Sequence, residues 1–259
     1  HYAEALVDLD GVLAQLPQNT GALYNKGIAL FHLLRYQEAL VSFNDVLEQN
    51  PALIEGWIQK GITLERLGLV DEAIEAFDKV LLLNPKHAEA AVKKGIVLVS
   101  LHRFEEAILI LNRALEEEPA NDRAWCNKGI ALSGLERYEE AIRSFDKALE
   151  INNRCTRATY EKANAISNLG NQAEAVALYD YALKNEPDNP KILYYKGVAL
   201  SRNERYDEAI DTFERALALE PENASGYYYL GVAYAGKERY YDAINALDHS
   251  LELYPSFAI

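Results

Sequence analysis

Methionine is absent from this 259-residue chain, and cysteine occurs only twice, at Cys126 and Cys155. Neither cysteine has a CxxC partner or a histidine at the spacing of a metal site, so we expect two free thiols rather than a disulfide or metal ligands. The five histidines form no HExxH motif, and no glycine-rich phosphate loop occurs. These absences predict a chain with no metal site and no cofactor.

Long apolar runs are missing as well, since none approaches the roughly 18 to 20 residues that a bilayer span requires. Positive charge is scarce: 26 lysines and arginines against 40 acidic residues give a net charge of −14. Such a chain repels nucleic-acid phosphates and anionic lipids, so we expect no nucleic-acid partner and no membrane contact. The acidic, amphipathic start HYAEALVDLD is unlike a signal peptide, which predicts a cytoplasmic protein.

What the chain does contain is a repeat of 34 residues. The segment KGIALFHLLRYQEALVSFNDVLEQNP, from residue 26, aligns without gaps with KGITLERLGLVDEAIEAFDKVLLLNP, from residue 60. Counted from Thr20, three columns mark the repeat: glycine at position 8 (Gly27, Gly61, Gly95, Gly129, Gly197, Gly231), alanine at position 20 (Ala39, Ala73, Ala107, Ala141, Ala175, Ala209, Ala243) and proline at position 32 (Pro51, Pro85, Pro119, Pro187, Pro221, Pro255). A fixed period of this length is the signature of a repeat architecture.

Each repeat predicts a helical hairpin, because apolar residues recur at three-and-four spacing over positions 4 to 14 and 17 to 28, with a polar turn between. A glycine inside a helix costs roughly 0.5 to 1 kcal/mol relative to alanine, so position 8 requires a compensating close approach of the paired helix. We expect alanine at position 20 to be the small residue that faces it, and proline to end the second helix.

These columns, with tyrosine at position 17 and phenylalanine at position 24, resemble the tetratricopeptide repeat family. The resemblance implies an all-α, right-handed superhelical solenoid of antiparallel helix pairs, whose first helices line a concave groove that binds segments of partner proteins. Position 7, a leucine in the family, is lysine in six copies here, and position 25 is acidic or an amide. We expect each lysine to extend its ammonium towards the second helix in a structural ladder, with a ligand-facing role as the alternative.

A single array is predicted over residues 1–259. Residues 1–19 match the second helix of a truncated repeat, full repeats follow at 20–53, 54–87, 88–121, 122–155, 156–189, 190–223 and 224–257, and residues 258–259 begin a cut-off repeat. Solenoids normally end in polar capping repeats, and neither end here resembles one, so we expect a fragment of a longer array.

The resemblance places positions 2, 5, 6, 9, 12 and 13 of each first helix in the groove. Position 9 forms an apolar row that is interrupted at Asn164, and tyrosines gather at positions 5 and 6 in the last three repeats. The apolar row is either a binding surface or partly buried between adjacent first helices, and the tyrosines are either ligand contacts or core filling.

Charged residues at the groove positions favour a basic groove. The bases are Arg66, Lys93, Arg123, Arg157, Lys191 and Arg202, and the acids are Glu55, Glu65, Glu89 and Glu161. This excess within an acidic chain predicts a ligand with an acidic stretch near the fourth to sixth repeats, whereas solvated cations at helix ends are the alternative.

The fifth repeat departs most from the pattern, since Asn153 replaces the proline, Ala163 the glycine and Asn164 the apolar residue. Its residues at predicted groove positions are Arg157, Tyr160, Glu161, Asn164 and Asn168. We expect the ligand to be recognised in this repeat, with plain sequence drift as the alternative.

Two specialised uses of the family are not expected. Position 5 holds no lysine, which argues against the carboxylate clamp of chaperone-tail binders. The asparagine ladder of sugar-transferase superhelices is broken, because Asn25 and Asn127 at position 6 are separated by Gln59 and Lys93 and followed by Glu161.

The leading prediction is a non-catalytic protein–protein interaction scaffold that binds a peptide segment in its groove. No catalytic residues are expected, because glutamates recur at position 19 beside arginines and a catalytic pair would be singular. The candidate groove residues are Tyr24, Ile28, Ile62, Ile96, Arg123, Asn127, Ile130, Arg157, Tyr160, Glu161, Asn164, Asn168, Lys191, Tyr194, Tyr195, Val198, Arg202, Tyr228 and Tyr229. The alternatives are end-to-end self-association through uncapped ends and an accessory arm of an enzyme encoded elsewhere.

Overall fold

The computed structural model describes residues 1–255, which form fifteen α-helices and no strand, so the all-α class is confirmed. The first helices of the hairpins are α2 (Thr20–His32), α4 (Ile54–Arg66), α6 (Ala88–Ser100), α8 (Asp122–Gly134), α10 (Thr156–Asn168), α12 (Pro190–Arg202) and α14 (Ala224–Gly236). The second helices are α3 (Tyr36–Gln49), α5 (Val70–Leu83), α7 (Phe104–Glu117), α9 (Tyr138–Ile151), α11 (Gln172–Asn185), α13 (Tyr206–Leu219) and α15 (Tyr240–Leu253), and α1 (Tyr2–Gln15) precedes them.

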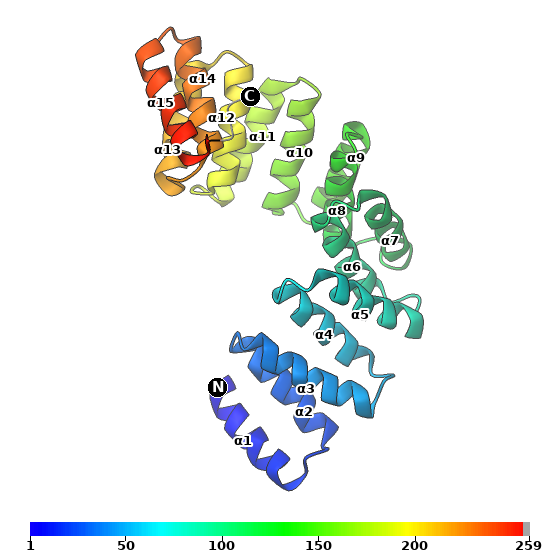
Figure 1. Ribbon diagram of the computed structural model, residues 1–259. Helices are drawn as coiled ribbons and strands as arrows, with labels where there is room; N and C mark the ends of the chain where they lie inside the picture. The colour runs from blue at the N-terminus through cyan, green and yellow to red at the C-terminus, as the bar shows by residue number, and fades with distance from the viewer. Residues whose placement is uncertain (256–259) are drawn as a thin grey trace. The chain divides into compact units, whose positions relative to one another are not determined.

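Contacts divide the chain into two compact units, His1–Ala131 and Leu132–Ile259. Within the units, consecutive helices pack side by side from α1 to α7 and from α9 to α15, as the ribbon shows (Figure 1). First helices of neighbouring repeats also touch, α2 against α4 in the first unit and α10 against α12 and α12 against α14 in the second. The boundaries of the seven repeats stay a prediction, and the cut-off repeat at 258–259 lies outside the described residues.

The second helices begin at position 17, and an arginine precedes most of them. Arg35, at position 16, immediately precedes α3 and pairs with Glu38 in the first turn of that helix. Its Nε donates to Oε1 of Glu38 at 2.7 Å, and its Nη2 donates to Oε2 at 2.6 Å. The same bidentate pair recurs at Arg103, Arg137 and Arg205. Since a carboxylate near a helix N-terminus is stabilising, these pairs account for the recurring glutamates as surface structure.

The turn inside each hairpin places position 15 in the left-handed region. Glycine fills it in only two repeats, at Gly68 with φ 76° and Gly170 with φ 91°. Elsewhere a side chain occupies the position, as at Leu34 with φ 61° and Glu204 with φ 57°. The hairpin geometry therefore overrides the local preference of these residues.

The atoms nearest to the helical glycine belong to the side chain at position 24 of the second helix. A Cβ built on Gly27 would lie 2.6 Å from Cε1 of Phe43, and one on Gly61 would lie 2.7 Å from Cε1 of Phe77. Both rings are fully buried. Glycine is thus required because a large side chain from the second helix packs directly on the backbone of the first.

The lysines of position 7 extend towards second helices, but the partner belongs to the preceding repeat rather than to the same hairpin. The pairs, from Nζ to Oδ1, are Lys26 with Asp10 at 2.7 Å, Lys94 with Asp78 at 2.5 Å, Lys162 with Asp146 at 2.6 Å and Lys196 with Asp180 at 2.6 Å. Each lysine side chain is less than a third exposed, so its stem is packed while its charge is paired. The ladder therefore joins one repeat to the next.

Where the preceding repeat offers an asparagine at position 25, a tryptophan takes over. The ammonium of Lys60 lies 5.1 Å from the ring centre of Trp57, and that of Lys128 lies 4.9 Å from the ring centre of Trp125. In the last repeat, where leucine replaces the lysine, the Tyr234 hydroxyl donates to Oε1 of Glu214 at 2.8 Å. Cation–π contacts and a tyrosine hydroxyl therefore contribute at these junctions.

The glycine packing leads to a first prediction. Replacing Gly61 with alanine places a methyl group against Phe77, so the free energy of unfolding should fall by about 1 to 3 kcal/mol. Replacing Gly11 with alanine at an exposed position of α1, where the added carbon meets no atom within 4 Å beyond its own stretch of helix, should raise it by about 0.5 to 1 kcal/mol. Urea unfolding checks both, and an unchanged midpoint for Gly61→Ala would contradict the packing argument.

The ladder leads to a second prediction. A double-mutant cycle with Lys196→Met and Asp180→Asn should give a coupling of about 0.2 to 1 kcal/mol, because the pair is partly exposed. The coupling should shrink at about 1 M salt, where the Debye length is about 3 Å. Additive effects of the two substitutions at low salt would rule out the ion pair as a stabilising contact.

Candidate functional site

The predicted groove residues fall on the first helices of both units. Tyr24, Ile28, Ile62, Ile96, Arg123, Asn127 and Ile130 belong to the first unit. Arg157, Tyr160, Glu161, Asn164, Asn168, Lys191, Tyr194, Tyr195, Val198, Arg202, Tyr228 and Tyr229 belong to the second. In the second unit, contacts between side chains connect several of these residues, so the candidate site is described there.

Position 9 does not form an open apolar surface. In the first unit, Ile28, Ile62, Ile96 and Ile130 are half-buried. In the second unit, Val198 is buried and only Val232 is exposed. Ile28 packs against one buried cluster, and Ile62, Ile96 and Ile130 pack against another, so these side chains are only partly accessible.

In the first unit, the two polar candidates differ in exposure. Arg123 is exposed, whereas Asn127 is only 3% exposed and its Nδ2 donates to the carbonyl of Arg123 at 2.7 Å. The Oδ1 atom of Asn127 has no hydrogen-bond partner among the described residues. Asn127 is therefore a buried residue of α8 rather than an exposed one.

The tyrosines of α12 and α14 serve both the core and the surface. The Tyr194 ring packs edge to face against Phe213, with centroids 6.2 Å apart, and against Tyr229 at 5.8 Å. Burial, followed by the neighbouring Tyr229 and Tyr195, raises the pKa of Tyr194 to about 12. Tyr228, next to Tyr229, is more than a third exposed. Tyr194 therefore fills the core, whereas Tyr228 in the same aromatic group is accessible.

Lys191 lies at the centre of the contacts between α10 and α12. Its Nζ is 3.4 Å from both the Tyr160 hydroxyl and Oε1 of Glu161. The ammonium also lies 5.0 Å from the ring centre of Tyr160 and 5.9 Å from that of Tyr195. Burial alone would lower the pKa of Lys191, but Glu161 and Tyr160 outweigh it and raise the pKa, so the side chain stays charged.

Asn164 continues this polar group along α10. Its Nδ2 donates to Oε2 of Glu161 at 3.0 Å, and its backbone carbonyl accepts from Nδ2 of Asn168 at 3.0 Å. Its Oδ1 accepts a 2.5 Å hydrogen bond from the hydroxyl of Tyr179, which comes from α11. We call the group formed by Tyr160, Glu161, Asn164, Tyr179 and Lys191 the polar cluster.

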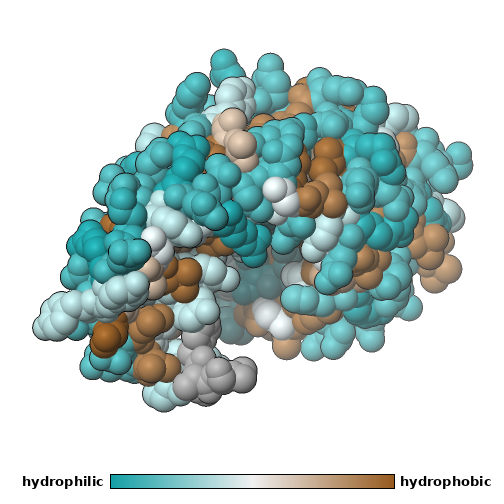
Figure 2. All heavy atoms as spheres, turned by 90° about the horizontal axis from the view of Figure 1, so that it is seen from above, coloured by the Kyte–Doolittle hydropathy of each residue, from teal (hydrophilic) through white to brown (hydrophobic). Residues whose placement is uncertain are grey.

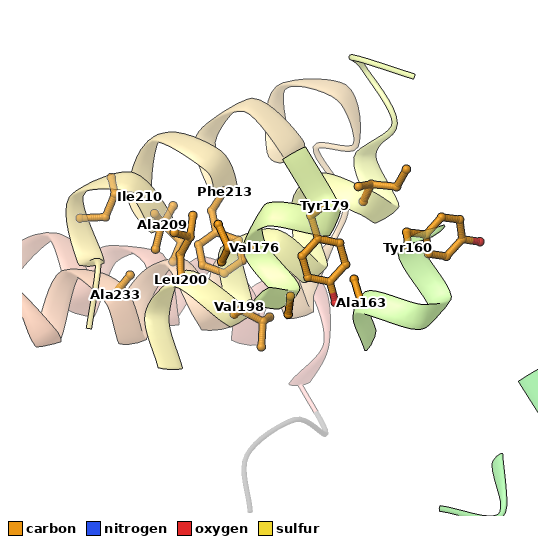
Figure 3. Packing of buried hydrophobic residues seen from close by; sticks show 14 of the residues in the cluster. Tyr160, Ala163, Val176, Tyr179, Val198, Leu200, Ala209, Ile210, Phe213 and Ala233 are labelled. Carbon is orange, nitrogen blue, oxygen red and sulfur yellow. The ribbon is translucent and has the colours of Figure 1, made fainter. Parts of the chain in front are cut away.

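Tyr179 is the member that the sequence analysis did not single out. It occupies position 24, where most repeats have phenylalanine, and it is only 1% exposed. Its ring points from α11 towards Ala163 on α10, whereas the Tyr160 hydroxyl points away from the packed residues (Figure 3). The signal was present, because tyrosine appears at position 24 in the same repeat in which alanine replaces glycine at position 8.

Asn153, in the proline column, does not alter the helix end. Helix α9 ends at Ile151, and the backbone N–H of Asn152 bonds the carbonyl of Ala148, as the corresponding asparagines do elsewhere. The Oδ1 of Asn152 accepts from the N–H of Arg154 at 3.2 Å, a turn repeated at Asn50 and Asn84. The asparagine at position 31, rather than position 32, therefore shapes this turn.

The remaining charged candidates of the second unit, Arg157 and Arg202, are exposed. Over residues 1–255, no group of three or more metal-ligating side chains comes together, and no helix is long and apolar enough to span a bilayer. In the space-filling view, hydrophobic residues form only small separate patches among hydrophilic ones (Figure 2). The arrangement offers hydrogen bonds, charge and aromatic faces for binding.

Helical hairpins in a 34-residue period define a repeat scaffold, and the comparisons identify which one. Tetratricopeptide repeat models match residues 1–53 and 160–219, 122–155, 65–127 and 224–257, and a model described as TPR repeat matches 201–238. The chain belongs to the tetratricopeptide repeat family. No curated protein matches the sequence.

Solved structures show the same fold. A tetratricopeptide repeat protein from Parabacteroides merdae is 20% identical with a TM-score of 0.72, over 90% of this chain and 92% of its own. A chain of the APC/C hetero-tetramer Cut9–Hcn1 is 18% identical to this chain, with a TM-score of 0.75. The match covers 98% of this chain and 50% of that chain. YrrB, described as a TPR protein with an unusual peptide-binding site, is 25% identical with a TM-score of 0.57, over 70% of this chain and 94% of that one.

The aromatic group leads to a third prediction. The folded-state pKa of Tyr194 is about 12, above the value of about 10 for an unfolded tyrosine, so the folded state holds its proton more tightly. The resulting stability is complete below pH 10 and is lost as the pH rises towards 12. Urea midpoints should therefore fall less steeply from pH 9 to 11 in Tyr194→Phe than in the wild type. Equal slopes would contradict this assignment.

Proposed function

We propose that this chain is a non-catalytic interaction scaffold, and that the first helices of its second unit bind a peptide segment of a partner protein that carries acidic residues. The observation that carries the proposal is the position of Lys191, a half-exposed cation held over the rings of Tyr160 and Tyr195. Such a cation can pair with a ligand carboxylate while the rings contact neighbouring apolar groups.

The charge of this face supports an acidic ligand. Arg157, Lys191 and Arg202 outnumber Glu161, although the whole chain carries a net charge of −14. Only 16% of the Glu161 side chain is exposed, and its carboxylate forms an ion pair with Lys191. Both arginines are exposed. The accessible charge is therefore mainly positive, and an acidic segment would be attracted to this face rather than to the rest of the surface.

The comparisons support the same class of function. YrrB is described as having a peptide-binding site, and Cut9 forms a hetero-tetramer with Hcn1. Peptide or protein binding by this chain agrees with those descriptions and with membership of the family. We retain a cytoplasmic location as part of the proposal.

Self-association is a second candidate, favoured by one observation. Helix α15 exposes Tyr240 and Tyr241, at 63% and 79%, together with Ile244 at 57%. In the repeat before it, Ile210, at the position of Ile244, is only 5% exposed. Light scattering over a range of concentrations tests this candidate, and a constant monomer mass would exclude it.

Binding of acidic peptides is the fourth prediction. A phage-displayed library of random 12-residue peptides, panned on the immobilised full chain, should yield binders rich in aspartate and glutamate. The triple variant Arg157→Glu, Lys191→Glu and Arg202→Glu should bind the selected peptides at least about tenfold more weakly, because attraction becomes repulsion. Fluorescence anisotropy with the labelled peptides measures the dissociation constants.

A matched control reverses the same amount of charge on second helices, through Arg143→Glu, Lys147→Glu and Lys184→Glu. All three residues are exposed, on α9 and α11, so this variant should bind as the wild type does. Equal weakening in both triple variants would show that only net charge matters. Unchanged binding in the first-helix variant would reject the proposed face.

A further inference from the structure

The fifth repeat differs from the other full repeats at three positions, 8, 9 and 24. Alanine replaces glycine at position 8 (Ala163), asparagine replaces an apolar residue at position 9 (Asn164), and tyrosine occupies position 24 (Tyr179). Separately, each change resembles sequence drift. The structure joins them, because Tyr179 extends from α11 towards Ala163 (Figure 3). Its hydroxyl bonds the side chain of Asn164 on α10.

We propose that Tyr179 is a positioning residue of the binding face: its buried hydroxyl sets the orientation of the Asn164 amide, which then bonds the main chain of a bound peptide. The inference rests on the proposed function and adds a specificity-determining residue that comes from the core rather than from the face.

Two partners at opposite ends of the amide fix its orientation. The Tyr179 hydroxyl donates to Oδ1 of Asn164 at 2.5 Å, while Nδ2 donates to Oε2 of Glu161 at 3.0 Å. An ionised carboxylate only accepts hydrogen bonds, so the reverse orientation would set Oδ1 against the oxygens of Glu161. Burial raises the pKa of Tyr179, so its hydroxyl keeps the proton it donates.

Glu161 is itself held in place. Its other oxygen, Oε1, lies 3.4 Å from Nζ of Lys191, and its side chain is only 16% exposed. A connected path therefore runs from Tyr179 in the core through Asn164 and Glu161 to Lys191, whose side chain is half-exposed. Connected polar groups of this kind restrict one another's orientation.

The oriented amide retains binding capacity. Oδ1 of Asn164 has a second lone pair and Nδ2 a second N–H, and the side chain is half-buried rather than covered. A peptide bond offers one donor and one acceptor, so an extended main chain can pair with both. Position 9 is isoleucine or valine in the other full repeats, which cannot make such bonds. The fifth repeat is thus where the peptide main chain is aligned, next to the carboxylate contact at Lys191.

The fifth prediction tests this with Tyr179→Phe in the full chain. Phenylalanine occupies the same position at Phe43, Phe77, Phe145 and Phe213, so the variant retains a side chain that the fold accepts. It should bind the library-selected acidic peptides about fivefold more weakly, since Asn164 loses one of its two restraints. Tyr181→Phe, which removes an exposed hydroxyl from the same helix, should bind as the wild type does.

A double-mutant cycle separates positioning from a structural effect. Asn164→Ala should weaken binding about tenfold, and Tyr179→Phe should have no further effect in that background, because the group it positions is gone. A merely structural role of Tyr179 would instead give the same loss in both backgrounds. In NMR spectra of the free chain, the Asn164 side-chain amide protons should exchange faster with solvent in Tyr179→Phe than in the wild type.

The outcomes distinguish the two proposals. If the Arg157, Lys191 and Arg202 reversal leaves peptide binding unchanged, the proposed function fails, and this inference fails with it. If that reversal weakens binding while Tyr179→Phe binds as the wild type, the proposed function stands and the positioning role of Tyr179 is refuted. Additive losses in the cycle refute it as well.

Discussion

Close packing of the side chain at position 24 on the backbone of the first helix is the contact on which the hairpins inside each unit depend. A ring such as Phe43 or Phe77 takes the space that a Cβ at Gly27 or Gly61 would need, so the two helices approach closely. The alanines at position 20 are buried in consequence. Because the contact recurs every 34 residues, each first helix presents the same positions to the outside of its hairpin.

The fifth hairpin modifies that contact and thereby changes the surface. Tyr179 keeps the buried aromatic ring but adds a hydroxyl, and the hydroxyl needs a partner because an unpaired buried polar group is costly. Asn164 supplies the partner at a position that is otherwise apolar. The tyrosine in the core is thus accompanied by a polar side chain, Asn164, on the first helix next to the one that carries Lys191.

Between repeats, the ladder shows how one task is met by different chemistry. Aspartates pair with Lys26, Lys94, Lys162 and Lys196, whereas the rings of Trp57 and Trp125 lie against Lys60 and Lys128. In each case a buried stem carries a charge that must be balanced near the junction of two repeats. The periodicity predicted that these lysines extend to a second helix, but it could not say of which repeat, since both choices lie at the same position.

The sequence by itself determined the helices, their period and the family, because apolar spacing, glycine and proline act through local geometry that each repeat restates. It also placed Asn164, Glu161 and Lys191 on first helices. Only the tertiary structure decided that position 24 packs on the glycine, that the lysines reach back one repeat and that Tyr179 bonds Asn164. These contacts join residues on different helices. The distance and rotation between two packed helices decide which residues meet, and local sequence patterns do not specify either quantity.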